Sequence, residues 1–401
     1  MKLHKTALVL GLFALLLATA CGEDEEGVNN GTNNGANNGG NNGGNNGGNN
    51  GGGPAVSPES PMGSFRIDTD TLSVTVPAGA TSVALVIDGA GSNLILAQKI
   101  TNPSGVAVMD WENDVYTNRT DATDGLYTVL IPNNPEVVLE PGVWTLQFLT
   151  DGSGFDATVE AVYKTDGLGS TIDFNLFFVG VDGLDAATAK APGPFQDILG
   201  NVKAVYAAKG ITLNFPEDAY IDITGADAEK YGKVDSFQEH AELFTLSGGH
   251  PEGRINYFFV GDISGEGGFE LLGLSPGVPP GPVGINGTER SGVSVNMTDF
   301  GADDAVIEII MAHELGHHLG AFHTTERNGA ALDPDGISGS DHLSDTPNCP
   351  DSADANGNKR LSAAECAAED GGNLMFWSPA NDSRAVTDGQ ATVWKGNPVT
   401  K

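Results

Sequence analysis

The sequence feature that most limits how this chain can fold is a long tract of asparagine and glycine near its beginning. Residues 29–53 comprise 12 Asn, 11 Gly, Thr32 and Ala36. A tract of this composition has no large apolar side chain to bury, so it cannot build a core and is expected to be a flexible tether. The chemistry of the chain must therefore lie in residues 54–401.

The residues before the tract have the layout of a signal peptide. Lys2 and Lys5 precede an almost unbroken apolar run from Ala7 to Ala20. This run is short for a membrane-spanning helix and suits a secretory signal. We therefore expect a signal peptide over residues 1–20 and a tether over residues 21–56.

The end of the apolar run, Leu17-Ala-Thr-Ala-Cys21, resembles a bacterial lipobox. The resemblance implies cleavage before Cys21 and attachment of a diacylglyceryl group to its thiol. Gly22 follows the cysteine, which in lipoproteins favours the outer membrane or the cell surface. We expect an exported protein that is anchored to a membrane through lipid on Cys21, or released from that surface. An ordinary signal peptide whose cleavage exposes a cysteine is the alternative.

The overall charge argues against several classes of partner. The 401 residues include 19 Lys and Arg against 53 Asp and Glu, so the formal net charge is −34. A chain this acidic repels the phosphates of nucleic acids and the headgroups of anionic lipids. We expect no nucleic-acid partner and a monomeric protein.

Residues 57–165 have the pattern of an all-β domain. Runs rich in β-branched and aromatic residues are separated by Gly, Pro, Asn and Asp, and lie at residues 72–76, 82–87, 127–131 and 143–148. Short strands with such turns are typical of a β-sandwich, of which the jelly roll is one form. We find no catalytic motif in this segment, so a binding or stabilising role is expected.

The pattern changes from residue 166 onward. Strands are expected at residues 171–179, 211–215 and 255–260, and helices at residues 195–208 and 302–319. Apolar side chains recur at helical spacing in the first helix, and Gly210 is expected to stop it. The mixture of strands and helices predicts an α+β domain over residues 166–401.

The second helix runs into the sequence HELGHHLGAFH, residues 313–323. His313 and His317 are four residues apart, so both imidazoles lie on one face of a helix and can bind one zinc ion. Gly320 can adopt the left-handed conformation that ends a helix, which lets His323 return as a third ligand. Three neutral imidazoles leave one coordination position open for water, as in catalytic zinc sites.

Two other residues of this segment receive different roles. Glu314 lies beside the histidines and is the candidate general base, which takes a proton from an activated water. His318 points away from the face of the two histidine ligands and is interpreted as a surface or core residue. A histidine-rich helix end that binds no metal is the alternative interpretation of the whole segment.

The extended motif resembles the active site of the metzincin zinc proteases, and Asp345-Thr-Pro347 is most like the pappalysin (cytophagalysin) family. The resemblance implies a zincin catalytic domain in residues 166–401. It also implies that Met375, within Asn373-Leu-Met375, forms the Met-turn beneath the zinc; a methionine of the ordinary core is the alternative. Trp377 stands where many metzincins have a tyrosine that assists the zinc, so such help must come from elsewhere or from the metal alone.

With Cys21 assigned to the lipid, Cys349 and Cys366 remain. Two cysteines in an exported protein are expected to form a disulfide. The loop between them carries oxygen ligands in the order of an EF-hand, namely Asp354, Asn356, Asn358 and Glu365.

Calcium binding in this loop is expected to be weak, because Lys359 replaces the glycine of the EF-hand pattern. A plain turn that closes the disulfide loop is the alternative. The resemblance to pappalysins also implies calcium near the zinc, for which the acidic loops at residues 333–335 and 341–345 are candidates.

One further motif suggests a different enzyme class. Residues 273–277, GLSPG, match the G-x-S-x-G elbow of serine hydrolases. In that elbow the residue after the serine donates its backbone N–H to the oxyanion, and Pro276 has no N–H. A serine hydrolase is therefore disfavoured.

The sequence thus predicts a zinc-dependent endopeptidase that cleaves extracellular proteins or peptides. The run PGVWTL at residues 141–146 is similar to a strand in the jelly-roll accessory domains of secreted bacterial proteases. The alternative is a calcium-stabilised surface-binding lipoprotein with a vestigial zinc site. The intact Glu314 argues against it, because decay of such a site usually removes the base first.

Overall fold

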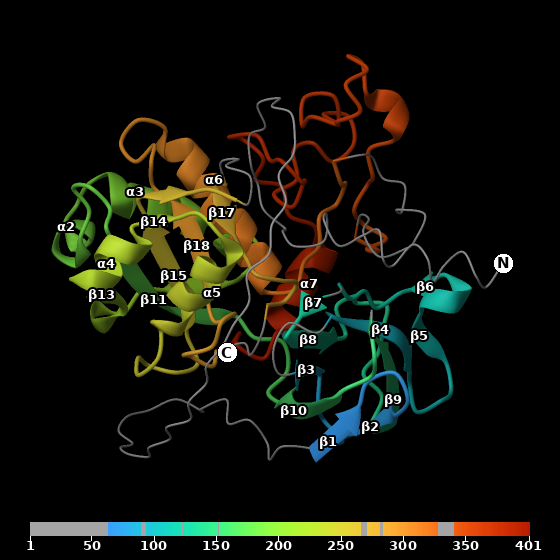
Figure 1. Cartoon of the computed structure of the whole chain (residues 1–401). Helices are drawn as coiled ribbons and strands as arrows, with labels where there is room; N and C mark the ends of the chain where they lie inside the picture. Colours follow the sequence, from blue (N-terminus) through green and yellow to red (C-terminus); the bar gives the residue numbers. More distant parts are fainter. Residues whose placement is uncertain are drawn as a thin grey trace.

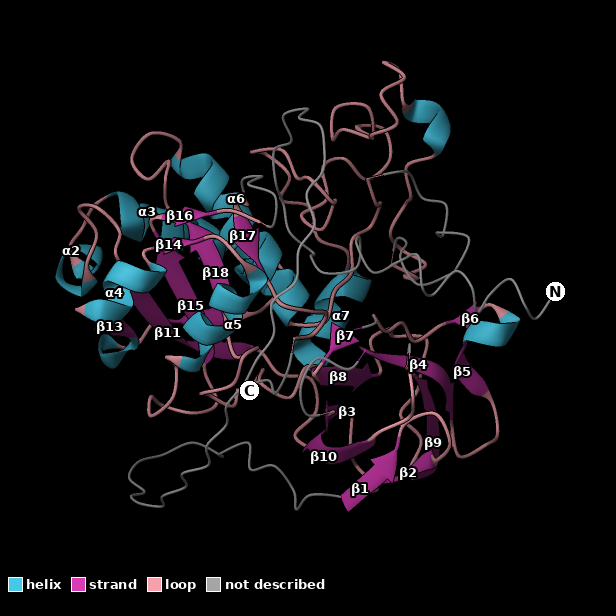
Figure 2. Ribbon diagram, in the orientation of Figure 1, coloured by secondary structure: helices cyan, strands magenta, loops and turns pink. Residues whose placement is uncertain are grey.

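A computed structural model describes residues 63–89, 94–121, 123–150, 152–265, 271–280, 284–327 and 341–401. The expected signal peptide, the tether, Cys21 and the acidic loop at residues 333–335 lie outside these ranges. The described part is a mixed α/β structure with several sheets and few helices (Figure 2), so it is sheet-rich and of the α+β type. Within it, no helix has the length and apolar character needed to cross a membrane.

The N-terminal β region, residues 63–164, contains two antiparallel sheets (Figure 1). The first sheet has the strand order β1 (Gly63–Arg66), β10 (Asp156–Lys164), β3 (Ser82–Asp88) and β8 (Leu126–Ile131). The second has the order β2 (Thr71–Val76), β9 (Gly142–Leu149), β4 (Leu94–Thr101), β5 (Ala107–Asp110) and β6 (Val115–Tyr116), with β7 (Thr123–Asp124) beside β4. The four strands expected from the sequence correspond to β2, β3, β8 and β9.

The two sheets share one core because their strands present alternate residues to it. Residues of β2 are exposed and buried in turn, so Leu72 and Val74 face inward. Across the core, the ring of Phe148 on β9 lies 5.6 Å from that of Phe65 and 6.2 Å from that of Tyr127. This alternation is typical of antiparallel sheets with one buried face.

The α/β region, residues 171–401, is built on a third sheet. Its strand order is β12 (Thr212–Asn214), β11 (Thr171–Val179), β15 (Ile255–Val260), β18 (Val293–Asn296) and β17 (Gly273–Leu274), and β13 (Tyr220–Ile223) also pairs with β11. All of these pairs are parallel except that of β17 with β18. A separate parallel pair joins β14 (Lys233–Val234) to β16 (Asp262–Ile263).

Both faces of this sheet are buried at the second half of β11, which accounts for the continuous apolar run at residues 176–179. Phe174, Leu176 and Phe178 pack in the same core as residues of α3 (Pro194–Ala207) and α6 (Asp304–His318). Phe177 and Val179 point to the other face, toward α4 (Ala226–Tyr231) and α5 (Phe237–Thr245). The remaining helical segments are α2 (Ala186–Lys190), α7 (Asp388–Gly396), and the short turns η1 (Trp111–Asn113), η2 (Glu217–Ala219) and η3 (Asp351–Ala353).

The expected boundaries of two elements change. The strand expected at residues 211–215 is limited to β12, and the helix expected at residues 302–319 begins later, at Asp304. Asp303 is therefore the N-cap of α6 rather than a residue of its first turn. The helix is also buried on all sides from Ile307 to His318, because the sheet, α3 and the C-terminal segment surround it.

The β region packs against the C-terminal part of the α/β region. Leu130 and Val162 of the β region share a small apolar cluster with Leu343 and Val393. The hydroxyl of Ser82 donates a hydrogen bond to the carbonyl of the last residue of α7. Figure 1 accordingly shows α7 beside β3 and β8.

Candidate metal centre

Helix α6 carries His313, Glu314 and His317 into the interior of the α/β region, where all three side chains are buried. Two tyrosines hold this part of the helix from the side. The hydroxyl of Tyr206, on α3, donates to the carbonyl of Ala312 at 2.8 Å, and that of Tyr257, on β15, donates to the carbonyl of Met311 at 2.7 Å. These two hydrogen bonds fix the position and rotation of α6, relative to α3 and the sheet, just before His313.

The helix ends in a Schellman turn centred on Gly320. This glycine has a φ of +104°, in the left-handed region. Its N–H donates to the carbonyl of His317 at 2.9 Å, and the N–H of Ala321 donates to the carbonyl of Gly316 at 3.0 Å, which are the two bonds of that motif. The turn sends the chain back toward the helix, so that His323 reaches the other two histidines.

The three histidines converge through their Nε2 atoms. Nε2 of His317 lies 3.0 Å from Nε2 of His313 and 3.0 Å from Nε2 of His323. Each Nδ1 faces an acceptor instead: the carbonyls of Leu374 and Ala321, at 2.6 and 2.8 Å, for His313 and His317, and a carboxylate for His323. These acceptors hold the proton on Nδ1, so the lone pairs of all three Nε2 atoms point to one spot.

Such a cluster fits a divalent transition metal. Zinc–nitrogen bonds of 2.0–2.1 Å in a tetrahedron separate two ligand nitrogens by roughly 3.3 Å, close to the spacing seen here. Burial, helped by the other histidines, lowers the pKa of His313 to about 3 and that of His317 well below its usual value. Both imidazoles are therefore neutral near pH 7, which is the form that binds a metal. The donor set leaves the identity of the metal open.

Glu314 lies next to His313 in the chain and is fully buried. Its Oε2 accepts a hydrogen bond of 2.7 Å from the backbone N–H of Ser275, which follows the edge strand β17. Its Oε1 has no hydrogen-bond partner among the described residues. Burial raises the pKa of this carboxyl group well above its usual value, and the bond from Ser275 opposes that shift. One oxygen is thus anchored while the other remains available.

Met375 lies directly under the helix. A Cβ atom on Gly316 would come within 2.3 Å of the Met375 sulfur. The helix and the segment that carries Met375 therefore approach as closely as glycine permits. The turn is fixed by Asn373, whose Oδ1 accepts from the Met375 N–H at 2.8 Å. The carbonyl of Leu374 then meets His313, which links the turn to the metal cluster.

The neighbouring acidic and aromatic residues have roles within the fold. Asp345 accepts from the N–H of Gly389 at 2.7 Å, in the first turn of α7. Asp341 accepts from the hydroxyl of Thr346, and burial raises the pKa of Asp341 to about 7. The indole of Trp377 donates to the carbonyl of Leu361 at 2.6 Å, outside the histidine cluster.

The disulfide loop, residues 349–366, precedes the Met375 turn in the chain. Cys349 and Cys366 are joined by an S–S bond of 2.05 Å. The side-chain oxygens of the EF-hand-like series accept hydrogen bonds from backbone N–H groups of the same loop, as Asp354 does from Gly357 and Lys359. Lys359 takes the left-handed conformation, with φ of +62°, that a glycine would adopt there. Calcium binding in this loop stays a prediction.

Sequence reasoning missed several residues that shape the cluster. Tyr206 lies within the helix predicted at residues 195–208 but was given no role there, and Ser275 was considered only as the serine of the disfavoured GLSPG motif. Glu326 was not singled out: its Oε2 lies 3.1 Å from Nδ1 of His323. Burial opposes ionisation of Glu326, but nearby His323 and Arg119 keep its pKa below the usual value. His318, left open as a surface or core residue, is buried.

The contacts of Tyr206 and Ser275 have no local sequence signature, because they join segments that are distant in the chain. The ligand set itself does have one, and it is the part that the motif predicted. The cluster His313, His317 and His323 is also recovered from the geometry of the described residues alone. Comparison with known proteins adds no identification: no protein-family model matches the chain, and no curated protein matches it significantly.

Proposed function

We propose that this chain is a zinc-dependent endopeptidase of the metzincin type, most like the pappalysins, carried on an exported lipoprotein. The observation that supports the proposal best is the convergence of three Nε2 atoms, with each Nδ1 held by an acceptor, beside a buried carboxylate. The parallel sheet with one antiparallel edge strand and the methionine beneath the helix are consistent with this family.

His313, His317 and His323 would hold the metal. Zinc, when bound, supplies a Lewis acid that polarises a carbonyl group and lowers the pKa of water. The lowered pKa values of His313 and His317 keep these two imidazoles free of competing protons near pH 7. Their second ring nitrogens are bound to Leu374, Ala321 and Glu326, which fixes the orientation of each ring.

Glu314 would act as the general base. Its Oε2 is held by the Ser275 N–H, so Oε1 is the oxygen that can take a proton from the attacking water. The same carboxyl group then passes that proton to the amine that leaves when the peptide bond breaks. The burial of Glu314 favours the protonated form between these two steps.

The test uses the exported chain, loaded with zinc and assayed on a peptide library with and without a chelator. Glu314→Gln preserves the shape of the side chain but removes its basicity, so we expect unchanged zinc content and a loss of cleavage of at least about a hundredfold. Ser275→Ala is the matched control, because it keeps the backbone N–H that holds Glu314 and removes the hydroxyl group of the serine in the G-x-S-x-G match.

The outcomes separate the candidate functions. Cleavage that needs zinc and Glu314 and survives Ser275→Ala supports the peptidase. Cleavage lost in Ser275→Ala and insensitive to chelation would instead indicate a serine enzyme. Stoichiometric zinc without any cleavage would leave the surface-binding lipoprotein as the better account.

A further inference from the structure

His323 is held differently from the other two histidines of the cluster. His313 and His317 belong to α6, whereas His323 lies five residues beyond the end of that helix, in a segment without regular secondary structure. Its position therefore depends on contacts made by the residues around it. One of them is direct: the carbonyl of His323 accepts a hydrogen bond of 2.6 Å from the N–H of Asp341.

A residue of the β region lies against the segment that carries His323. The guanidinium carbon of Arg119, between β6 and β7, is 4.3 Å from the centre of the Phe322 ring. Arg119 and Phe322 are only 6% and 5% exposed. A cation above an aromatic ring is attracted by the ring electrons, and the attraction is stronger when both groups are removed from water. Phe322 directly precedes His323, so this contact restrains the ligand's backbone.

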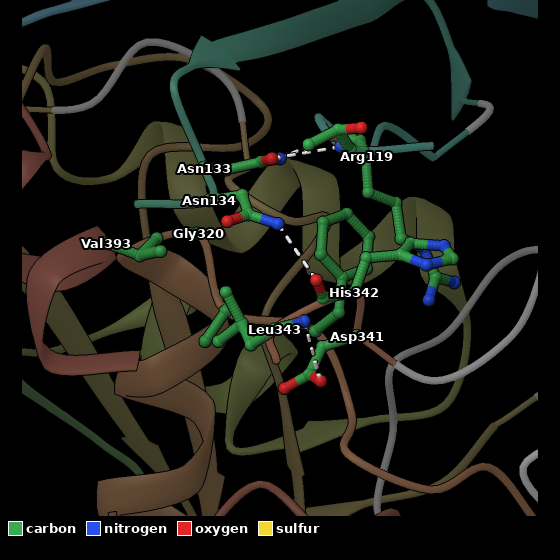
Figure 3. A pocket seen from close by; sticks show the side chains of 11 residues that line it. Arg119, Asn133, Asn134, Gly320, Asp341, His342, Leu343 and Val393 are labelled. Carbon is green, nitrogen blue, oxygen red and sulfur yellow. Dashed lines mark hydrogen bonds between the residues drawn. The ribbon is translucent and has the colours of Figure 1, made fainter. Parts of the chain in front are cut away.

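Arg119 is itself fixed in place by the β region. The backbone N–H of Arg119 donates to Oδ1 of Asn133 at 2.9 Å, and the backbone carbonyl of Arg119 accepts from the side-chain amide of Asn133 (Figure 3). Asn133 is held in turn, because its N–H donates to Oδ1 of Asn118 at 3.0 Å. The arginine therefore presents its guanidinium from a rigid support and not from a free loop.

A second set of contacts links the β region to His323 by a longer route. The side-chain amide of Asn134 donates to the carbonyl of His342 at 2.9 Å, as Figure 3 shows. The ring of Tyr116 stacks on His342, with centroids 5.7 Å apart and an interplanar angle of 16°. His342 follows Asp341, whose N–H binds the carbonyl of His323. The β region thus supports the third ligand by two routes.

We propose that the β region is a structural part of the metal centre, and that Arg119 and Asn134 are positioning residues for the ligand His323. Arg119 acts through the ring of Phe322, and Asn134 acts through His342 and Asp341. The inference rests on the proposed metal centre and is independent of whether the enzyme cleaves peptides. It assigns to the β region a role beyond binding or stabilising: without it, His323 would lose two of its supports, whereas His313 and His317 would keep theirs on α6.

The test measures zinc affinity of the exported chain by competition with a chromophoric chelator, and the absorption spectrum of bound Co²⁺. We expect Arg119→Ala to weaken zinc binding by about tenfold, the scale found when a support of a metal ligand is lost. The Co²⁺ spectrum should change as well, because the position of one nitrogen ligand changes. Arg119→Lys retains a cation above the ring and should bind zinc more tightly than Arg119→Ala.

Arg66→Ala is the matched control. Arg66 lies on β1 of the same region, its side chain is 47% exposed, and its ion pair is with an exposed aspartate. Zinc affinity and the Co²⁺ spectrum should not change in this variant. Any general effect of weakening the β region would appear in both arginine variants as a lower unfolding temperature, whereas loss of ligand support appears only in Arg119→Ala.

A double-mutant cycle with Phe322→Leu tests the route of the effect. If Arg119 acts through this ring, adding Arg119→Ala to Phe322→Leu lowers zinc affinity little further; fully additive losses would overturn that route. If Arg119→Ala does not fold, Asn134→Ala decides, and wild-type zinc affinity in it overturns the proposal. A folded Arg119→Ala with wild-type affinity also overturns it, and leaves the peptidase proposal intact. Conversely, zinc binding without cleavage refutes the peptidase and not this inference.

Discussion

At the scale of single residues, the contact between Gly316 and Met375 defines the metal centre most tightly. Only glycine leaves space for the methionine sulfur at this position, because a Cβ atom on residue 316 would lie 2.3 Å from that sulfur. The same turn supplies the carbonyl of Leu374 to His313. The position of one candidate metal ligand is therefore coupled to a packing contact three residues further along the same face of the helix.

We expect Gly316→Ala to lower stability by about 1–2 kcal/mol, less than rigid overpacking would cost, because methionine can adjust its shape. Zinc affinity should fall as well, because the Met375 turn must shift and moves the carbonyl that holds His313. Thermal unfolding and chelator competition measure the two effects.

Gly200→Ala provides the matched control for this substitution. Gly200 lies within α3, and no atom lies within 4 Å of the position that its Cβ would occupy. Alanine at such a site is expected to stabilise the helix by roughly 0.5–1 kcal/mol. If Gly316→Ala also stabilised the protein and left zinc binding unchanged, the close contact with Met375 would be wrong.

At the scale of elements, the end of α6 decides whether three histidines can meet. The helix supplies two ligands by its regular geometry, and the Schellman turn at Gly320 returns the chain for the third. The turn also touches the β region, because a Cβ on Gly320 would come within 2.8 Å of a methyl group of Leu130. This element is consequently sensitive both to backbone conformation and to packing between the two regions.

Gly320→Ala should destabilise the protein by more than the roughly 1–2 kcal/mol that a left-handed alanine costs, and it should weaken zinc binding. Gly210→Ala separates the cost of the left-handed backbone from the cost of the steric contact. Gly210 also has a positive φ, of +72°, but only the flexible side-chain nitrogen of Lys395 lies near its Cβ position, at 3.6 Å. We expect Gly210→Ala to show the backbone cost alone, with unchanged zinc affinity. Equal losses of zinc affinity in both variants would contradict the role given to the Gly320 turn.

The disulfide loop is a second element with a measurable contribution. Cys349 and Cys366 are 17 residues apart, and closing a loop of that size restricts the unfolded chain by about 3 kcal/mol in the chain-entropy account. Replacing both cysteines by alanine, or adding a reductant, should therefore lower the unfolding temperature by several degrees. An unchanged unfolding temperature after complete reduction would show that the bond contributes nothing to stability.

At the scale of the whole molecule, buried histidines make stability depend on pH. His240 on α5 is buried, and burial lowers its pKa from 6.5 to about 4. The imidazole of His240 binds a proton more readily in the unfolded chain than in the folded one. The free energy of unfolding is therefore unaffected by His240 above pH 6.5, and it decreases as the pH falls from 6.5 toward 4. The loss from this one residue is up to about 3 kcal/mol.

Denaturant unfolding between pH 8 and pH 4 checks this prediction. The free energy of unfolding should decrease below pH 6.5, and His240→Leu, which removes the titrating group, should reduce the slope in that window. An unchanged slope in the variant would show that other groups cause the acid lability. His240 lies outside the metal cluster, so the measurement can be made without zinc.

The local parts of the fold could be predicted because they depend on neighbours in sequence. The helical spacing around Ile198 and Val202 predicted α3, and the β-branched and aromatic residues at 171–179 predicted β11. The boundaries of α6 were less accurate, because its capping and burial are set by segments elsewhere in the chain. The supports Tyr206, Tyr257 and Ser275 could not be predicted for the same reason.

The sequence by itself determined the set of candidate ligands, since the spacing of His313, His317 and Gly320 imposes one helix face and a turn after it. Only the tertiary structure decided how that set is held. The Leu374 acceptor of His313, the anchored Glu314 and the Arg119–Phe322 contact all join residues that are distant in the chain. Short-range spacing follows from helix geometry, whereas these contacts follow from the packing of whole sheets, which no local pattern encodes.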